Sequence, residues 1–309
     1  MQLKGARFSL TPASEDASFR RYFRATLEDG ASYVAMDAPP EKEDCRPFVH
    51  VARLLEGAGV HAPRIFAEDL KAGFLLLADL GTRTYLHVVN DENADALFGD
   101  AIEALVRWQR ATRPGELPPY DEALLRREMN LFGEWYVARH RRIALSPEQK
   151  QALEDIVHLL VASALAQPKV YVHRDYMPRN LMVSNPNPGV IDFQDAVLGP
   201  ITYDIVSLTR DAFISWDERR VLDWSVRYWE KAKHAGLPVN EEFGEFWRAF
   251  EWMGLQRHLK VLGIFARINY RDGKPKYLED TPRFIAYARA VAKRYSALAP
   301  LLKLLDEIE

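Results

Sequence analysis

Apolar and polar residues alternate along much of the first part of the chain, which is the pattern of half-buried strands. The alternation is clearest over residues 19–27, and a Glu-Asp-Gly turn then leads into a second alternating run over residues 32–36. Residues 63–66 and 73–77 predict two more strands, and residues 43–56 predict an amphipathic helix. We therefore expect a small lobe that contains a sheet and one helix.

Beyond residue 81 the apolar positions recur with the period of an α-helix. This pattern predicts helices over residues 94–112, 120–139, 147–166, 218–234, 241–267 and 282–305. Ser146 and Gln149 form a capping box at the start of the third of these. We expect an α+β chain of two lobes, a β-rich one over residues 1–79 and a mainly helical one over residues 80–309, with a hinge near residues 78–81.

Composition and charge are those of an ordinary globular protein: 309 residues, 48% apolar and 28% charged, with a net charge of −3. The small negative charge argues against a nucleic-acid partner. Cys45 stands alone, so an internal disulfide is excluded. The first residues lack an apolar signal core, and no apolar run approaches a membrane span. We expect a cytoplasmic monomer that binds neither membrane nor nucleic acid.

One short segment carries the candidate chemistry. Residues 173–180 read HRDYMPRN, and residues 191–193 read IDF. A catalytic loop H-R-D-x-x-x-x-N followed by a metal-binding aspartate is typical of phosphoryl-transfer enzymes. Asp175 suits the role of proton acceptor, and Asn180 and Asp192 suit the role of Mg²⁺ ligands. We therefore expect ATP and Mg²⁺ as cofactors, with His173 bracing the loop.

Local structure is expected to bring the two metal ligands together. Residues 181–183 and 190–191 predict a hairpin closed by a turn over residues 185–189. If Ser184 lies opposite Val190, then Met182 faces Asp192, and Asn180 follows two residues along on the same face. The alternative is that these polar residues are turn formers and helix caps.

With these motifs the chain resembles the aminoglycoside phosphotransferase and choline kinase superfamily. The resemblance covers nearly the whole chain, from residues 16–24 through 34–41 to 202–208. More narrowly, these stretches resemble the bacterial kinases of cell-wall recycling, which phosphorylate amino sugars, N-acetylmuramate and N-acetylglucosamine, at the anomeric hydroxyl. The resemblance implies a two-lobed protein-kinase-like fold, with a nucleotide-binding lobe first. It also implies that Asp204 supports the catalytic loop, although an N-cap role fits this residue equally.

The chain departs from the general kinase pattern around the phosphates. A G-x-G-x-x-G loop is missing, and the hairpin tip at residues 13–18 offers Ser14 and Ser18 instead, which also suit a plain turn. If residues 34–36 are aligned on V-A-I of V-A-I-K, Asp37 stands where the phosphate-binding lysine is expected. The candidate replacements and the hinge residue expected to contact the nucleotide are Arg20, Arg21, Arg24, Lys42 and Asp79.

The candidate residues for binding the substrate that accepts the phosphate are basic. Arg257, His258 and Lys260 lie near one face of a predicted helix, and Arg210 follows the segment opened by Asp204. They are candidates for binding an anionic group such as the lactyl carboxylate of N-acetylmuramate, although a basic helical face is often simply solvated. Two other functions stay open, a kinase of aminoglycoside or choline type and a non-catalytic kinase-fold binding protein.

Overall fold

The structure is a computed structural model that describes residues 7–14 and 19–309. The chain forms two compact units. Unit 1 comprises Met1–Pro114 and His173–Ala196, and unit 2 comprises Gly115–Val172 and Val197–Glu309. Residues 80–114 and the segment 173–196, which carries the H-R-D motif, are thus grouped with the N-terminal sheet in unit 1.

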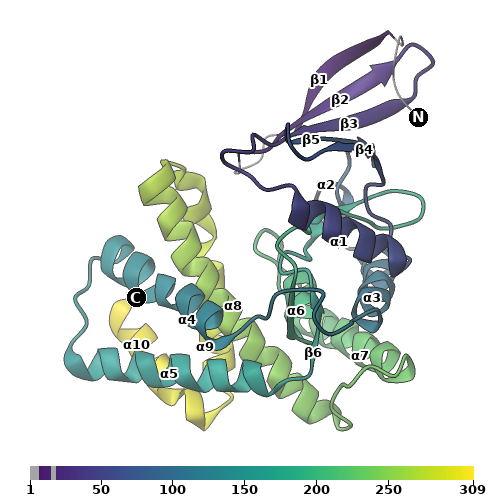
Figure 1. The fold of residues 1–309 in the computed structure, drawn as a ribbon. Coiled ribbons are helices and arrows are strands. Elements are labelled where there is room, and N and C mark those ends of the chain that lie inside the picture. Colours follow the sequence, from purple (N-terminus) through teal and green to yellow (C-terminus); the bar gives the residue numbers. More distant parts are fainter. Residues whose placement is uncertain (1–6, 15–18) are drawn as a thin grey trace. The chain divides into compact units, whose positions relative to one another are not determined.

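Unit 1 is built on an antiparallel sheet of five strands in the order β1-β2-β3-β5-β4 (Figure 1). The strands are β1 (Phe8–Ser14), β2 (Arg21–Leu27), β3 (Ser32–Asp37), β4 (Ile65–Asp69) and β5 (Phe74–Ala78). Gly30, with φ of 84°, supplies the left-handed turn residue between β2 and β3, a conformation that glycine adopts without strain. The alternating pattern predicted β2 to β5 closely.

The remaining elements of unit 1 are short, apart from two helices. They are α1 (Arg46–Gly57), α2 (Tyr85–Val88), α3 (Ala94–Arg110), η2 (Pro178–Asn180), β7 (Leu181–Met182) and β8 (Gly189–Val190). Helix α1 buries Phe48, Val51, Ala52 and Leu55, which recur at helical spacing. The expected helix at residues 43–56 is confirmed, with a start three residues later.

Unit 2 is mainly helical. Its elements are α4 (Glu122–Leu131), η1 (Phe132–His140), α5 (Pro147–Ala166), β6 (Lys169–Val172), β9 (Val197–Pro200), α6 (Tyr203–Thr209), α7 (Glu218–His234), α8 (Phe243–Asp272), η3 (Pro275–Asp280), α9 (Thr281–Ala292), η4 (Ser296–Leu298) and α10 (Ala299–Ile308). The long helix α8 contacts α4, η1, α5, α6 and α9, so it forms the centre of this unit. Helix α8 approaches α4 closely at Gly263, where a Cβ would lie 2.3 Å from the Leu131 carbonyl carbon.

Two predicted helices of unit 2 differ from the structure. Residues 120–139 were expected as one α-helix, but the chain changes from α4 to the π-helix η1 at Phe132. Residues 282–305 were also expected as one helix, but α9 ends at Ala292 and α10 begins at Ala299. The break is anchored by Tyr295, whose hydroxyl donates to the Glu251 carboxylate at 2.7 Å. The buried tertiary contact therefore overrides the continuous helical pattern.

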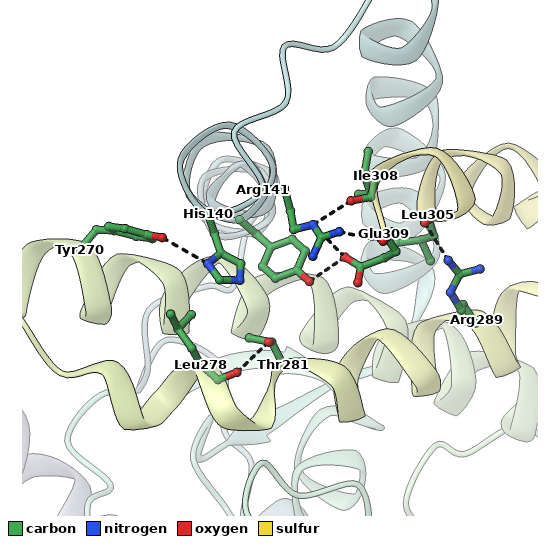
Figure 2. Close-up of polar contacts among 10 residues, drawn as sticks. His140, Arg141, Tyr270, Leu278, Thr281, Arg289, Leu305, Ile308 and Glu309 are labelled. Carbon is green, nitrogen blue, oxygen red and sulfur yellow. Dashed lines mark hydrogen bonds and ion pairs between the residues drawn. The ribbon is translucent and has the colours of Figure 1, made fainter.

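The last residues of the chain are bound to η1 (Figure 2). Arg141 donates to the carbonyl oxygens of Ile308 and Glu309, both at 2.8 Å. Tyr136 donates from its hydroxyl to the Glu309 carboxylate at 2.7 Å. Glu309 is thus bonded to residues of unit 2, and α10 beside it buries Leu301, Leu304 and Leu305. In the part of the chain that the structure describes, every helix is too short or too polar to cross a bilayer.

Candidate active site

The catalytic segment begins and ends at paired residues. Strand β6 ends at Val172, which pairs with Val197 of β9, and residues 173–196 between them belong to unit 1. Within this segment Arg174 and Asp192 have φ angles of 75° and 64°, a left-handed conformation that is costly for residues other than glycine. Such conformations cost roughly 1–3 kcal/mol each and concentrate at functional sites.

The structure brings the two expected metal ligands together. Asn180 donates from Nδ2 to the carbonyl oxygen of Asp175 at 2.9 Å and to Oδ2 of Asp192 at 3.3 Å. Because both contacts use the amide nitrogen, the Oδ1 atom of Asn180 is left to accept or to coordinate. Gln194 donates from Nε2 to Oδ1 of Asp192 at 3.0 Å. The amide and carboxylate are thus held in fixed orientations, Asn180 directly before β7 and Asp192 shortly after β8.

The hairpin that holds these ligands has another register than expected. Leu181 pairs with Val190, whereas Ser184 was expected opposite that residue, a difference of three positions. The connection between the strands is longer than predicted because Ser184 belongs to it and donates to the carbonyl of Pro186 at 2.8 Å. The observed register still joins the ligands, since Ile191 donates from its backbone N–H to the Asn180 carbonyl at 3.1 Å.

His173 is 1% exposed and bonds on both sides of its ring. Its Nδ1 accepts from the backbone N–H of Asp175 at 3.2 Å, so the proton lies on Nε2, which donates to the Ile191 carbonyl at 3.0 Å. Burial lowers the pKa of His173 to about 4, so the ring is neutral near pH 7. These contacts are those of a residue that braces the loop. Asp204 is fully buried in the first turn of α6, in unit 2.

A pocket of about 360 Å³ lies within unit 1, between the sheet and the metal-ligand pair. Val34, Leu77 and Phe193 supply apolar walls, and residues 78–82 after β5 supply backbone. Among the described residues, the charged ones that line the pocket are Arg24, Asp79, Arg179 and Asp192. Its size and its mixture of apolar walls with a few polar groups are those of small-molecule sites.

Arg24 and Asp79 form a two-pronged ion pair in this pocket. Arg24 Nε lies 2.5 Å from Oδ2 of Asp79, and Arg24 Nη2 lies 3.0 Å from Oδ1. Arg24 also donates to the carbonyl of Gly81 at 2.9 Å. Burial would raise the pKa of Asp79, but hydrogen bonds from Arg24, Gly81 and Ser32 hold it below its ordinary value. The ion pair links β2 to the segment after β5 and neutralises the charge of Arg24.

The other cations expected at the phosphates lie elsewhere among the described residues. Arg21 pairs with Asp37 and is 63% exposed in its side chain, and Lys42 lies over the Phe19 ring. Arg20 precedes β2 and is outside the pocket lining. The side chain of Ser14 and the whole of Ser18 lie outside the described part of the chain.

Asp37, which the V-A-I-K alignment places at the lysine position, is outside the pocket lining. Val34 lines the pocket, and because side chains alternate along a strand, Met36 is the next residue on that face. Asp37 points to the opposite face, where it meets Arg21. Met36 is uncharged and 0% exposed, so neither it nor Asp37 supplies a cation to the pocket from β3.

The residues expected to contact the acceptor all lie in unit 2 and are buried. Arg210 lies 3.3 Å from the Glu251 carboxylate, and Lys260 lies 3.0 Å from that of Glu128. Arg257 is 2% exposed and donates to the Arg210 carbonyl at 3.4 Å.

His258 is fully buried, stacks on Tyr287 at 5.0 Å, and has its pKa lowered by burial. The ion pairs favour structural roles for Arg210 and Lys260. Among the described residues, Arg257 donates to a backbone carbonyl, and its charge acts on the buried Asp211 carboxylate.

Sequence reasoning missed two residues near the metal-ligand pair. Gln194, two residues after Asp192, orients that carboxylate. Arg179, directly before Asn180, lines the pocket. The sequence offered only their position as a guide, since Arg179 lies within the H-R-D motif and Gln194 directly follows the I-D-F motif.

Comparison with known proteins agrees with this geometry. A profile described as the phosphotransferase enzyme family matches residues 9–239. The N-acetylmuramate/N-acetylglucosamine kinase of Pseudomonas putida is 58% identical over 301 residues, which cover 97% of this chain and 88% of that protein. The protein of the same name from Pseudomonas aeruginosa is 59% identical over 299 residues, with the same coverage of both chains.

The fold also has relatives among solved structures. The ADP-bound aminoglycoside phosphotransferase APH(2'')-Ib superposes with a TM-score of 0.61 at 15% identity, over 91% of this chain and 93% of that one. The expected fold class, with a small β-rich lobe and a larger helical one as in protein kinases, is confirmed.

Proposed function

Because the chain belongs to the phosphotransferase enzyme family, we propose that it is an ATP-dependent kinase of N-acetylmuramate and N-acetylglucosamine. The product is the sugar 1-phosphate, and the proposed setting is the recycling of cell-wall sugars. The observation that carries the proposal is the cluster of Asp175, Asn180 and Asp192 in a chain 58% identical to a kinase named for both sugars.

The donor set near Asp192 fits Mg²⁺. An amide oxygen and a carboxylate are hard oxygen ligands, and Mg²⁺ is usually held by one or two protein groups together with phosphates and water. Asn180 and Asp192 would hold the ion, which when bound supplies charge neutralisation and alignment of the phosphates. Gln194 keeps the Asp192 carboxylate turned toward Asn180.

Proton transfer and nucleotide binding are the proposed roles of Asp175 and the pocket. Asp175 accepts the proton of the attacking hydroxyl while the bond between the terminal phosphorus and ADP breaks and the new phosphorus–oxygen bond forms. The pocket of about 360 Å³ accommodates the nucleotide base between Val34, Leu77 and Phe193, beside the backbone of residues 78–82.

Arg257 is the proposed partner of the lactyl carboxylate. It is a buried guanidinium that donates a long bond to the Arg210 carbonyl and lies near the Asp211 carboxylate, and a charge-assisted contact to a substrate carboxylate suits its remaining donors. Kinases of aminoglycosides or choline would instead need unpaired carboxylates for a cation. Of the buried carboxylates described in unit 2, Glu128 and Glu251 are paired with cations, and Asp211 accepts from the backbone N–H groups of Phe213 and Ile214 and lies near Arg257.

Phosphorus NMR of reactions with MgATP and a panel of sugars tests the proposal. We expect an anomeric phosphate from both N-acetylmuramate and N-acetylglucosamine, and none with the Asp175→Asn variant. A 6-phosphate product would contradict the anomeric assignment. MgATP binding without turnover on any sugar would favour a non-catalytic binding protein instead.

A further inference from the structure

Residues 79–81 line the pocket of unit 1 and directly follow β5. Gly81 has no side chain, so its backbone itself forms part of the pocket wall. The pairing of β5 with β3 ends at Ala78, so the segment lies beyond the paired part of the sheet. Connecting segments are more mobile than the elements they join unless other contacts fix them. The position of this wall therefore depends on contacts with other parts of unit 1.

Arg24 supplies such contacts from β2. Its guanidinium bonds twice to the Asp79 carboxylate, at 2.5 and 3.0 Å, and a third time to the Gly81 carbonyl, at 2.9 Å. The same carboxylate accepts from the Gly81 backbone N–H at 2.9 Å. One arginine side chain is thus bonded to both ends of the segment. A two-pronged guanidinium–carboxylate pair fixes orientation as well as distance, so it holds the segment in one geometry.

The ion pair is sheltered from solvent. The side chains of Arg24 and Asp79 are 20% and 5% exposed. Burial by itself would raise the pKa of Asp79, but the hydrogen bonds that the carboxylate accepts lower this pKa below its ordinary value, so both partners are charged near pH 7. Removing one partner of a sheltered pair leaves the other charge poorly solvated. The segment would then move to hydrate that charge.

Leu80, between the two bonded residues, is held by packing. A Cβ on Gly189, at the start of β8, would lie 2.8 Å from Leu80 Cδ1, so the two residues touch closely. None of the bonds to Arg24 and Asp79 uses the backbone N–H or carbonyl of Leu80. The anchoring of the segment therefore leaves its middle peptide groups unoccupied by the anchor itself.

The same contacts argue against phosphate binding by Arg24, which was one of the cations expected there. Its Nε and Nη2 atoms are engaged by Asp79 and Gly81, and the carboxylate neutralises the guanidinium charge. A phosphate in their place would have to displace a carboxylate that is 5% exposed and that Gly81 also binds. The bonds of Arg24 thus serve the wall of the pocket.

We propose that Arg24 is a positioning residue for the nucleotide, which acts through Asp79 and Gly81 to fix the backbone wall against which the base binds. The inference rests on the proposed kinase function and concerns its nucleotide side alone. Arg24 itself touches neither the phosphates nor the acceptor. Its loss should therefore weaken nucleotide binding and spare the transfer step once the site is saturated, because uniform binding affects KM and not kcat.

The kinetic test compares Arg24→Ala with the parent protein on N-acetylglucosamine. If the freed segment holds the binding geometry about a tenth of the time, the apparent Kd for MgATP rises about tenfold. We expect KM for MgATP to rise by about this factor, with kcat at saturating MgATP and KM for the sugar within about threefold of the parent. Arg53→Ala is the matched control, because it removes an ion pair of unit 1 that is 64% exposed at Arg53 and lies outside this pocket.

Two further variants separate positioning from a general loss of stability. Arg24→Lys keeps the charge but cannot bind the carboxylate and the Gly81 carbonyl with one planar fork, so its KM for MgATP should lie between those of the parent and Arg24→Ala. Arg24→Ala combined with Asp79→Asn should raise KM little beyond the larger single effect, since both changes remove the same interaction. Thermal unfolding without nucleotide checks that each variant folds, and Arg24→Lys carries the test if Arg24→Ala does not.

The binding test does not depend on turnover. Affinities are measured for adenosine, by displacement of a fluorescent nucleotide, and for the magnesium complex of a non-hydrolysable ATP analogue, by calorimetry. A residue that fixes the wall at the base should weaken both ligands by the same factor, about tenfold in Arg24→Ala, whereas a phosphate contact would weaken the ATP analogue alone.

Three outcomes would overturn the assignment. If KM for MgATP and both affinities stay within threefold of the parent, the ion pair is merely structural. If adenosine binds normally while the ATP analogue binds weakly or kcat falls about 100-fold, Arg24 contacts the phosphates. A parent protein that binds neither ligand would contradict the kinase function itself, and with it this role.

Discussion

Replacing Lys260 by methionine tests whether this lysine holds the helical unit together or binds the acceptor. Its Nζ lies 3.0 Å from the Glu128 carboxylate and donates to the Tyr203 hydroxyl at 3.0 Å. The two charged side chains are only 10% and 8% exposed. Tyr120 also donates to Glu128. The variant would leave a buried carboxylate without its cation.

The magnitude follows from this geometry. Two unit charges 3.0 Å apart attract by about 5 kcal/mol at an effective dielectric constant of about 20. Breaking a buried pair by removing one partner typically costs about 3–5 kcal/mol, because the other charge stays desolvated. For Lys260→Met we expect a loss of this size in unfolding free energy, and a fall of roughly 6–15 °C in the unfolding midpoint.

Chemical and thermal denaturation followed by circular dichroism measure the loss. Adding Glu128→Gln to Lys260→Met should recover a large part of it, because the unpaired charge disappears. Lys303→Met is the matched control, since Lys303 is 80% exposed and 3.9 Å from Glu307, where ion pairs contribute about 0–1 kcal/mol. Unchanged stability together with a loss of efficiency on N-acetylmuramate alone would refute the structural role and restore the acceptor role.

Three further predictions concern the site. Asp175→Asn should abolish turnover and spare MgATP binding, whereas Asp192→Ala should weaken MgATP binding itself; calorimetry and steady-state rates separate the two. Arg257→Ala should lower kcat/KM roughly ten- to a hundredfold for N-acetylmuramate and leave N-acetylglucosamine nearly unchanged, and equal losses on both would contradict carboxylate recognition. His173, with a folded pKa of about 4 below its ordinary value of 6.5, binds fewer protons than in the unfolded chain between these values, so stability should fall by about 3 kcal/mol as pH drops from 6.5 to 4; His173→Gln should flatten that part of the pH profile of unfolding.

Much of the fold follows from local pattern. The predicted helices at residues 147–166 and 218–234 match α5 and α7 at both ends. The capping box is confirmed, since Gln149 donates from its backbone N–H to Ser146 Oγ at 3.2 Å. Periodicity and caps depend on residues within one or two turns of each other, and such information is fully present in the sequence.

Features that depend on distant residues were predicted less well. The hairpin register was three positions off at Val190, because the length of its turn depends on side-chain bonds such as that of Ser184. The break between α9 and α10 depends on Glu251, far away in the sequence, which binds Tyr295. The choice between Met36 and Asp37 as the pocket-side residue also needed the pairing of β3 with its neighbours.

By itself the sequence was enough to predict the groups proposed to do the chemistry, because Asp175, Asn180 and Asp192 lie within one short loop and hairpin. Only the tertiary structure showed which charges form ion pairs, namely Arg24 with Asp79 and Lys260 with Glu128. It also showed that Arg179 lines the pocket. The physical reason is that an ion pair depends on distance and burial between residues far apart in the chain. A local motif encodes chemical identity, whereas the energy of a charge is set by everything that folds around it.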